Sequence, residues 1–92
     1  HIVRSNRESG FGRYDIMLIP HDKNQLGIII EFKTVKQTHQ NTLEQDLEKT
    51  ANEALKQINT KNYAAELSQI GIKNQLKLGI AFATKTCLVL KG

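Results

Sequence analysis

The run GIIIEFK at residues 27–33 is the feature that most constrains the fold of this chain. Three consecutive β-branched residues favour an extended strand, and an unbroken apolar run is typical of a strand buried on both faces. Because the side chains of a strand alternate between its two faces, Glu31 and Lys33 are expected to project from one face and Phe32 from the other. The sequence therefore predicts a central strand whose end places two charges on one surface.

Turn-forming residues and apolar alternation divide the rest of the chain into short elements. A polar stretch over residues 6–12, which contains Gly10 and Gly12, is predicted to be a loop. The single cysteine, Cys87, lies in an apolar run and is expected in the core. The remaining strands are predicted over residues 2–5, 13–19, 76–83 and 87–90.

Helical spacing predicts two helices between the third and fourth strands. Thr42 and Gln45 fit a capping box, which starts a helix that runs to about Asn59. A second helix over about residues 62–70 is predicted to end at Gly71. The apolar positions expected to face inward are Leu43, Leu47, Ala51, Ala54, Leu55 and Ile58 in the first helix, and Tyr63, Leu67 and Ile70 in the second.

The order strand, strand, strand, helix, helix, strand, strand predicts an α/β fold. A helical crossover between two strands favours their parallel pairing, so we expect a mixed sheet with helices packed on it. The 92 residues, 39% of them hydrophobic and 24% charged, suit one small globular domain. A chain of this length buries a limited core, and we expect a partner domain or a second copy to cover an apolar face.

Two carboxylates and an ammonium group are the candidate chemical site. Asp15 lies within the second predicted strand, and pairing of that strand with the third is expected to bring Asp15 beside Glu31. Magnesium prefers oxygen ligands, so Asp15, Glu31 and the main-chain carbonyl of Phe32 are candidate ligands. Lys33 is suited to orient a water or to stabilise negative charge, which is the chemistry of phosphodiester hydrolysis. The alternative is a solvated strand end with an ordinary ion pair.

The net charge and the remaining polar residues bear on which ligand the chain binds. A formal charge of +4 suits a polyanion such as nucleic acid. His21 and His39 lie in polar turns without metal-ligand spacing and are expected to be exposed. Several lysines fit either a phosphate track or a merely solubilising surface, and these are Lys23, Lys36, Lys49, Lys56 and Lys61.

One cysteine and the absence of a long apolar stretch bear on location. A single Cys excludes an intramolecular disulfide framework, and a reducing, cytoplasmic location is the default expectation. No stretch approaches the roughly 20 apolar residues that cross a bilayer, so no membrane partner is expected.

Four segments together resemble a known family. They are residues 7–15 (RESGFGRYD), 28–33 (IIIEFK), 53–58 (EALKQI) with Tyr63, and 79–82 (GIAF). This set resembles the PD-(D/E)XK nuclease superfamily, and in particular the nuclease-like domain that follows an AAA-type ATPase-like module at the C-terminal end of bacterial proteins. The resemblance covers about residues 3–89. It implies a restriction-endonuclease-like core and, as partners, nucleic acid, with DNA favoured, and an N-terminal ATPase-like domain of the same parent chain.

The resemblance also implies roles for individual residues. It assigns metal binding, by Mg²⁺ or Mn²⁺, to Asp15 and Glu31, a catalytic role to Lys33, and a supporting polar role to Gln57, with Tyr63 as a further candidate. Two roles are open for Glu8: it is either a third acidic metal ligand or one member of a surface ion pair with Arg7 or Arg13.

Two features depart from the pattern of the superfamily. Tyr14 stands where the family motif has proline, and the helix that opens the family core has no counterpart here. The absence of an initiating Met and the strand-like pattern from Ile2 predict a fragment of a longer protein, with His1 as a candidate remnant of an expression tag. The resemblance implies that this fragment is C-terminal.

Two other functions compete with a nuclease. A non-catalytic domain of the same fold would regulate or dimerise the attached ATPase-like module. A plain interaction module would leave Asp15 and Glu31 too far apart to share one ion. The distance between these two carboxylates separates the last alternative from the first.

Overall fold

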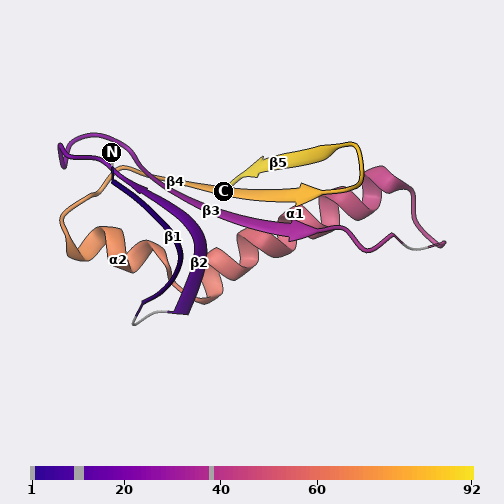
Figure 1. Cartoon of the computed structure of the whole chain (residues 1–92), viewed down its shortest axis with the longest axis horizontal. Helices are drawn as coiled ribbons and strands as arrows, with labels where there is room; N and C mark the ends of the chain where they lie inside the picture. The colour runs from indigo at the N-terminus through magenta and orange to yellow at the C-terminus, as the bar shows by residue number, and fades with distance from the viewer. Residues whose placement is uncertain (1, 10–11, 38) are drawn as a thin grey trace.

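The computed structural model describes residues 2–9, 12–37 and 39–92, with the main chain alone for residues 4–9 and 12–14. Within these residues, five strands and two helices follow one another in the predicted order, strand, strand, strand, helix, helix, strand, strand (Figure 1). They are β1 (Ile2–Ser9), β2 (Gly12–Ile19), β3 (Gly27–Thr34), α1 (Leu43–Thr60), α2 (Ala64–Gln69), β4 (Gln75–Phe82) and β5 (Cys87–Lys91).

The strands form one mixed sheet whose spatial order matches the chain order, β1-β2-β3-β4-β5. Consecutive strands joined by short connections pair antiparallel, whereas β3 and β4 pair in parallel from Gly27↔Gln75 to Thr34↔Phe82. The parallel pair is the one joined through α1 and α2, as a crossover requires. The predicted α/β fold with a mixed sheet is confirmed.

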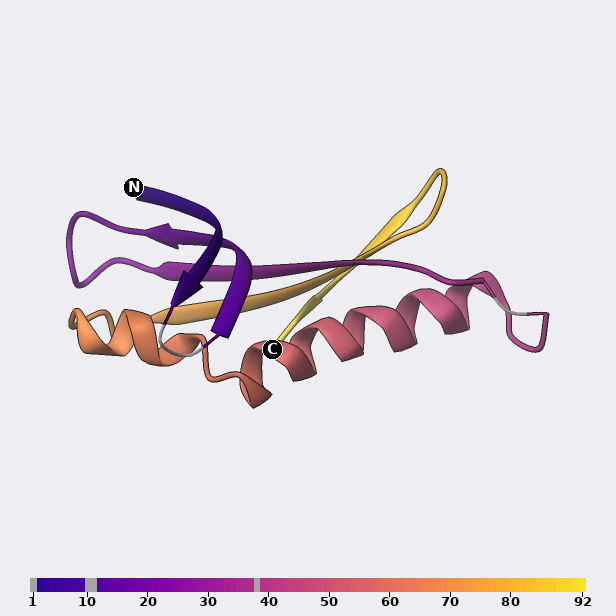
Figure 2. The same cartoon turned by 60° about the horizontal axis from the view of Figure 1, so that its bottom comes forward.

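Both helices cover the same face of the sheet (Figure 2). α1 begins at a complete capping box, in which the Thr42 hydroxyl accepts from the Gln45 N–H at 3.2 Å and the Gln45 side chain accepts from the Thr42 N–H at 2.9 Å. One stripe of this helix is buried against the sheet, namely Leu47, Ala51, Ala54 and Ile58. The start and the inward face of α1 are therefore set by local sequence.

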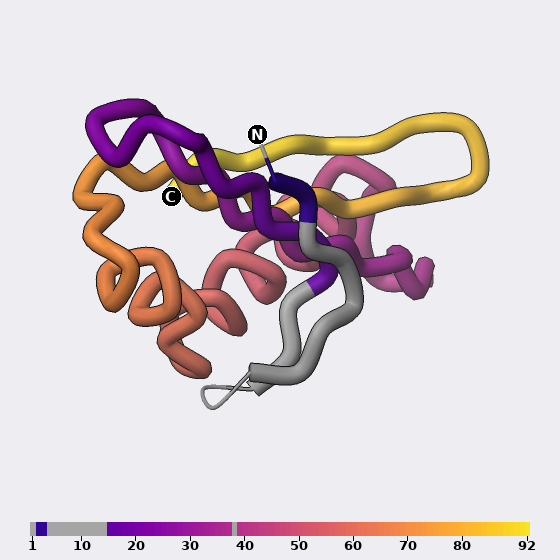
Figure 3. Tube along the Cα trace, turned by 60° about the vertical axis from the view of Figure 1, so that its left-hand side comes forward, coloured from indigo at the N-terminus to yellow at the C-terminus, as the bar shows by residue number. Residues whose placement is uncertain are grey.

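The core lies between the helices and this face, in two clusters. One cluster joins β2 and β3 to the end of α1 and to α2, and comprises Met17, Ile19, Ile29, Ile58, Tyr63, Leu67 and Ile72. The other joins the first half of α1 to β4, through Val35, Leu47, Ala51 and Ala81. Figure 3 shows α1 and α2 together below the sheet, with the β4–β5 hairpin extending away from them.

The opposite face of the sheet is apolar and half-exposed. Ile28, Ile30 and Phe32 are partly buried there, while Val3 and Val89 are 62% and 49% exposed. The expectation that β3 is buried on both faces is therefore wrong, because in the described part of the chain both helices pack on one side only.

Further expectations differ from the structure. Leu43 was expected to face inward but is 37% exposed, because it is the first residue of α1. β1 continues to Ser9 and β2 begins at Gly12, where a loop over residues 6–12 was predicted, because cross-strand pairing extends the hairpin through polar residues. Cys87 is exposed, because it pairs with Phe82 at the end of the β4–β5 hairpin, beyond the helices. Ile70 is 38% exposed, because α2 ends at Gln69 and the chain turns at Gly71 with φ of 89°.

Helix α1 and the sheet approach each other closely at Gly79 of β4. A methyl group there would lie 2.5 Å from the Ala51 carbonyl oxygen of α1, so Gly79→Ala must push the helix away. We expect this substitution to destabilise the fold by about 1–3 kcal/mol in chemical denaturation. Gly92→Ala is the matched control, because its methyl group would meet only the flexible end of Leu55. Equal stability of the two variants would contradict tight packing at Gly79.

Candidate active site

The candidate site lies where β2 separates from β3. The pairing of these strands is recorded from Leu18↔Ile28 to Ile16↔Ile30, and Asp15 is the next residue beyond it. There the Asp15 carboxylate takes the place of a main-chain partner, because its Oδ2 accepts a hydrogen bond of 2.7 Å from the Phe32 N–H. Asp15 therefore lies against the main chain of β3 at Phe32, the residue that follows Glu31.

Glu31 projects from β3 to the helix side of the sheet and is only 6% exposed. Its Oε1 accepts a hydrogen bond of 2.8 Å from Nε2 of Gln57, which comes from the second half of α1. The same Nε2 lies 3.4 Å from the hydroxyl of Tyr63, a side chain that is 1% exposed. Thus α1 and the residue before α2 hold one oxygen of the carboxyl in place.

The other oxygen of this carboxyl, Oε2, is buried and has no hydrogen-bond partner within the described part of the chain. A buried carboxylate oxygen without a partner is costly, and such exceptions are a common sign of a missing ion or water. Burial raises the pKa of Glu31 from 4.5 to about 7, and the charge of Asp15 adds to this rise. The charge of Lys33 and the main chain of Asp15 oppose the rise without cancelling it.

These features suit a divalent cation. An ion between Asp15 and Glu31 would satisfy Oε2, offset the repulsion between the carboxylates and lower the pKa of Glu31 against the effect of burial. Two carboxylates match the preference of magnesium for oxygen ligands. The described side chains contain no group of three or more His, Cys, Asp or Glu that could hold a metal, so the fit rests on this pair.

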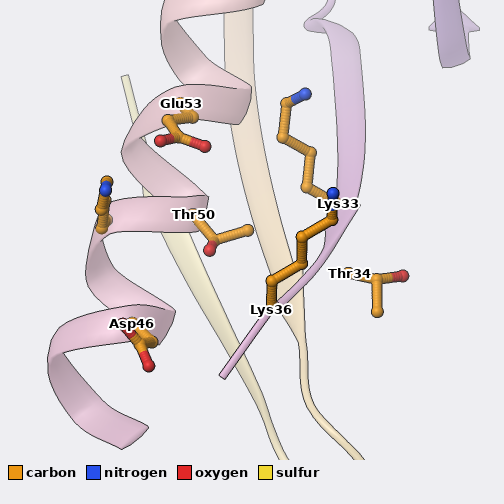
Figure 4. A pocket seen from close by; sticks show the side chains of 7 residues that line it. Lys33, Thr34, Lys36, Asp46, Thr50 and Glu53 are labelled. Atoms are coloured by element: carbon orange, nitrogen blue, oxygen red, sulfur yellow. The ribbon is translucent and has the colours of Figure 1, made fainter. Parts of the chain in front are cut away.

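Lys33 follows Glu31 on the same face and lies at the mouth of a cavity of about 460 Å³ between the end of β3 and the first half of α1. Figure 4 shows Lys33 and Lys36 on the strand side, facing Asp46, Thr50 and Glu53 on the helix side. Among the described residues, the lining comprises Lys33, Thr34, Lys36, Asp46, Lys49, Thr50 and Glu53.

The structure brings together most of the residues singled out in the sequence. Asp15, Glu31, Phe32, Lys33, Gln57 and Tyr63 all lie around the point where β2 leaves β3. The side chain of Glu8 lies outside the described residues. His21 and His39 are exposed, as expected.

Two residues near the site were missed from the sequence. Asp46 is only 4% exposed and accepts a hydrogen bond of 3.3 Å from Asn41 Nδ2, and Thr50 lies one turn further along α1. Their spacing of four residues, flanking the apolar stripe, was the available signal. It was not informative alone, because polar residues beside such a stripe are usually solvated.

A comparison with models of protein families shows the superfamily to which the chain belongs. The family model described as the PD-(D/E)XK nuclease superfamily matches residues 1–92, so the chain belongs to this superfamily. Its mixed sheet with packed helices is consistent with the restriction-endonuclease-like core of that class. Members of this superfamily generally use divalent metals. No curated protein and no solved structure matches the chain. No helix among the described residues is long and apolar enough to cross a membrane.

The raised pKa of Glu31 gives a pH-dependent stability. Below about pH 4.5 the carboxyl is protonated in both the folded and the unfolded chain, whereas between pH 4.5 and about 7 only the unfolded chain ionises. Stability is therefore lost as the pH rises through this window. In the absence of metal, after allowance for solvent screening, we expect Glu31→Gln to be more stable than the wild type by about 1–2 kcal/mol at pH 8 and by little at pH 5.

Chemical denaturation at the two pH values measures this difference. Glu48→Gln is the matched control, because Glu48 is an exposed glutamate of α1. The same gain at both pH values, or an equal gain in the control, would contradict an ionisation cost at Glu31.

Proposed function

We propose that this domain is a metal-dependent nuclease that hydrolyses phosphodiester bonds of nucleic acid, with DNA as the favoured substrate and Mg²⁺ or Mn²⁺ as cofactor. The observation that carries the proposal is the buried, unpartnered Oε2 of Glu31 beside the Asp15 carboxylate. Membership of a nuclease superfamily supports nucleic acid as the ligand.

The proposed ligands of the ion are Asp15, Glu31 and the main-chain carbonyl of Phe32. In a β-strand, the N–H and C=O of one residue point to the same side. Because the Phe32 N–H points to Asp15, the carbonyl of the same residue is directed to the side where β2 no longer pairs with β3. When bound, the ion lowers the pKa of a coordinated water and offsets negative charge on the phosphodiester.

The protein side chains complete the chemistry. The Lys33 ammonium shares the face of Glu31 and donates hydrogen bonds to the attacking water or to a phosphate oxygen, where negative charge develops. Gln57 holds Oε1 of Glu31 at 2.8 Å and so turns Oε2 toward the ion. Tyr63 stabilises the orientation of Gln57 from the core. Gln57 and Tyr63 therefore act as positioning residues.

The proposed setting is the C-terminal end of a longer, cytoplasmic bacterial protein, after an AAA-type ATPase-like module. The apolar face of the sheet opposite the helices, with Val3 and Val89 largely exposed, supports a further contact there. The attached module or a second copy of the domain is a candidate for that contact.

Substitution of the site residues tests the hydrolytic activity. We expect cleavage of labelled DNA in Mg²⁺ or Mn²⁺ to fall by about a hundredfold or more in Asp15→Asn and in Lys33→Ala, because each removes a group that acts on the reacting atoms. Gln57→Ala is expected to lose about 10–100-fold, because it frees Glu31 without removing a ligand. Single-stranded DNA, duplex DNA and RNA are compared in one gel assay.

Lys73→Ala is the matched control for this assay, because Lys73 is an exposed lysine before β4, at the opposite end of the sheet. Cleavage that survives both Asp15→Asn and Lys33→Ala would overturn the mechanism. Absence of cleavage by a folded wild type on every substrate would favour the non-catalytic, regulatory alternative.

Metal binding has a readout that does not depend on activity. Mn²⁺ at 100 times its Kd stabilises a protein by about 2.7 kcal/mol, so thermal unfolding of the wild type is expected to shift upward by several degrees. Glu31→Gln is expected to lose most of this shift, whereas Glu48→Gln retains it. A shift of the same size in Glu31→Gln would place the metal elsewhere.

A further inference from the structure

The cavity beside Lys33 is a feature of the described residues that the proposed hydrolysis leaves without a role. It has a volume of about 460 Å³ and opens between the segment after β3 and the first half of α1. Pockets of a few hundred Å³ hold a ligand the size of a nucleotide. Because Lys33 belongs both to this cavity and to the candidate active site, whatever occupies the cavity lies next to the reacting phosphate.

The charged groups of the lining indicate what chemistry the cavity receives. The lining contains three lysines, Lys33, Lys36 and Lys49, and two acids, Asp46 and Glu53. Asp46 is 96% removed from solvent and accepts a hydrogen bond from Asn41, so its charge is already engaged by the protein. Lys36 and Lys49 are exposed and come from the two sides of the cavity, the strand end and the helix.

A neutral group of the lining also agrees with an anionic occupant. Thr50 of α1 adds a hydroxyl on the helix side, and a hydroxyl donates readily to a phosphate oxygen. Lysine ammonium groups together with hydroxyls are typical contacts of a nucleic-acid backbone, which carries affinity without reading sequence.

We propose that this cavity binds a backbone phosphate of the nucleic-acid strand next to the phosphate that is cleaved, held by Lys36 and Lys49 with the Thr50 hydroxyl. This inference rests on the proposed nuclease function and adds to it a substrate-binding subsite outside the reacting atoms. The subsite fixes the path of the strand, which runs from the point where β2 leaves β3 along the cleft between β3 and α1.

The test separates binding from cleavage. Binding of a fluorescent oligonucleotide is measured by anisotropy in an Asp15→Asn background with Mg²⁺, over a series of salt concentrations. Each phosphate contact contributes about 0.7–0.9 to the slope of log K against log salt. We expect Lys36→Ala and Lys49→Ala each to lower the slope by about one contact and to weaken binding several-fold at moderate salt, with Lys36→Arg retaining the wild-type values.

Lys73→Ala is again the matched control, with the same change of charge at the other end of the sheet, and it is expected to leave the slope nearly unchanged. Slopes for Lys36→Ala and Lys49→Ala equal to that of Lys73→Ala overturn the subsite, as does absence of binding in the Asp15→Asn background. Cleavage that depends on Asp15 together with unchanged slopes leaves the nuclease intact and removes only the subsite. If the slopes of Lys36→Ala and Lys49→Ala are reduced but the wild type cleaves no substrate, the subsite is supported and the proposed hydrolysis is contradicted.

Discussion

The contact between α1 and the sheet at Gly79 is the constraint on which the rest of the site depends. Without a side chain at this position, the helix lies so close to β4 that an added methyl group would be 2.5 Å from the Ala51 carbonyl oxygen. The same helix carries Gln57 into hydrogen-bond distance of Glu31 and buries that carboxyl. It also provides one wall of the cavity beside Lys33. Helix packing thus sets the burial, the orientation and the neighbours of the acidic group together.

Burial of Glu31 makes the site electrostatically unfavourable in the absence of a cation. The carboxyl loses water, lies near the negative charge of Asp15 and leaves Oε2 without a partner among the described residues. Buried polar groups normally have hydrogen-bond partners, and groups with perturbed pKa values are often found at functional sites. The unfavourable term is the physical reason for regarding this pair of carboxylates as a cation site rather than as an incidental strand end.

The extent to which the site was predictable differs from residue to residue. The alternation of side chains along a strand was enough to place Glu31 and Lys33 on one face. The position of Asp15 beside Glu31 depends on the pairing of β2 with β3 and on the end of that pairing at Ile16. No local sequence pattern encodes where two strands separate. Gln57 was assigned by family resemblance, and its contact with Glu31 depends on the angle at which α1 crosses the sheet. Asp46 was missed because an acid beside an apolar stripe is usually exposed.

Local sequence patterns were sufficient to predict the element order, the capping box at Thr42, most of the buried stripe of α1 and the central strand with its two charges on one face. These features depend on periodicity and on hydrogen bonds between near neighbours, which are local. Three features required the folded chain: both helices cover one face, Cys87 is exposed, and a carboxyl oxygen of Glu31 is buried without a partner among the described residues. These outcomes depend on contacts between residues far apart in the chain, and the register and packing that create such contacts are properties of the whole fold.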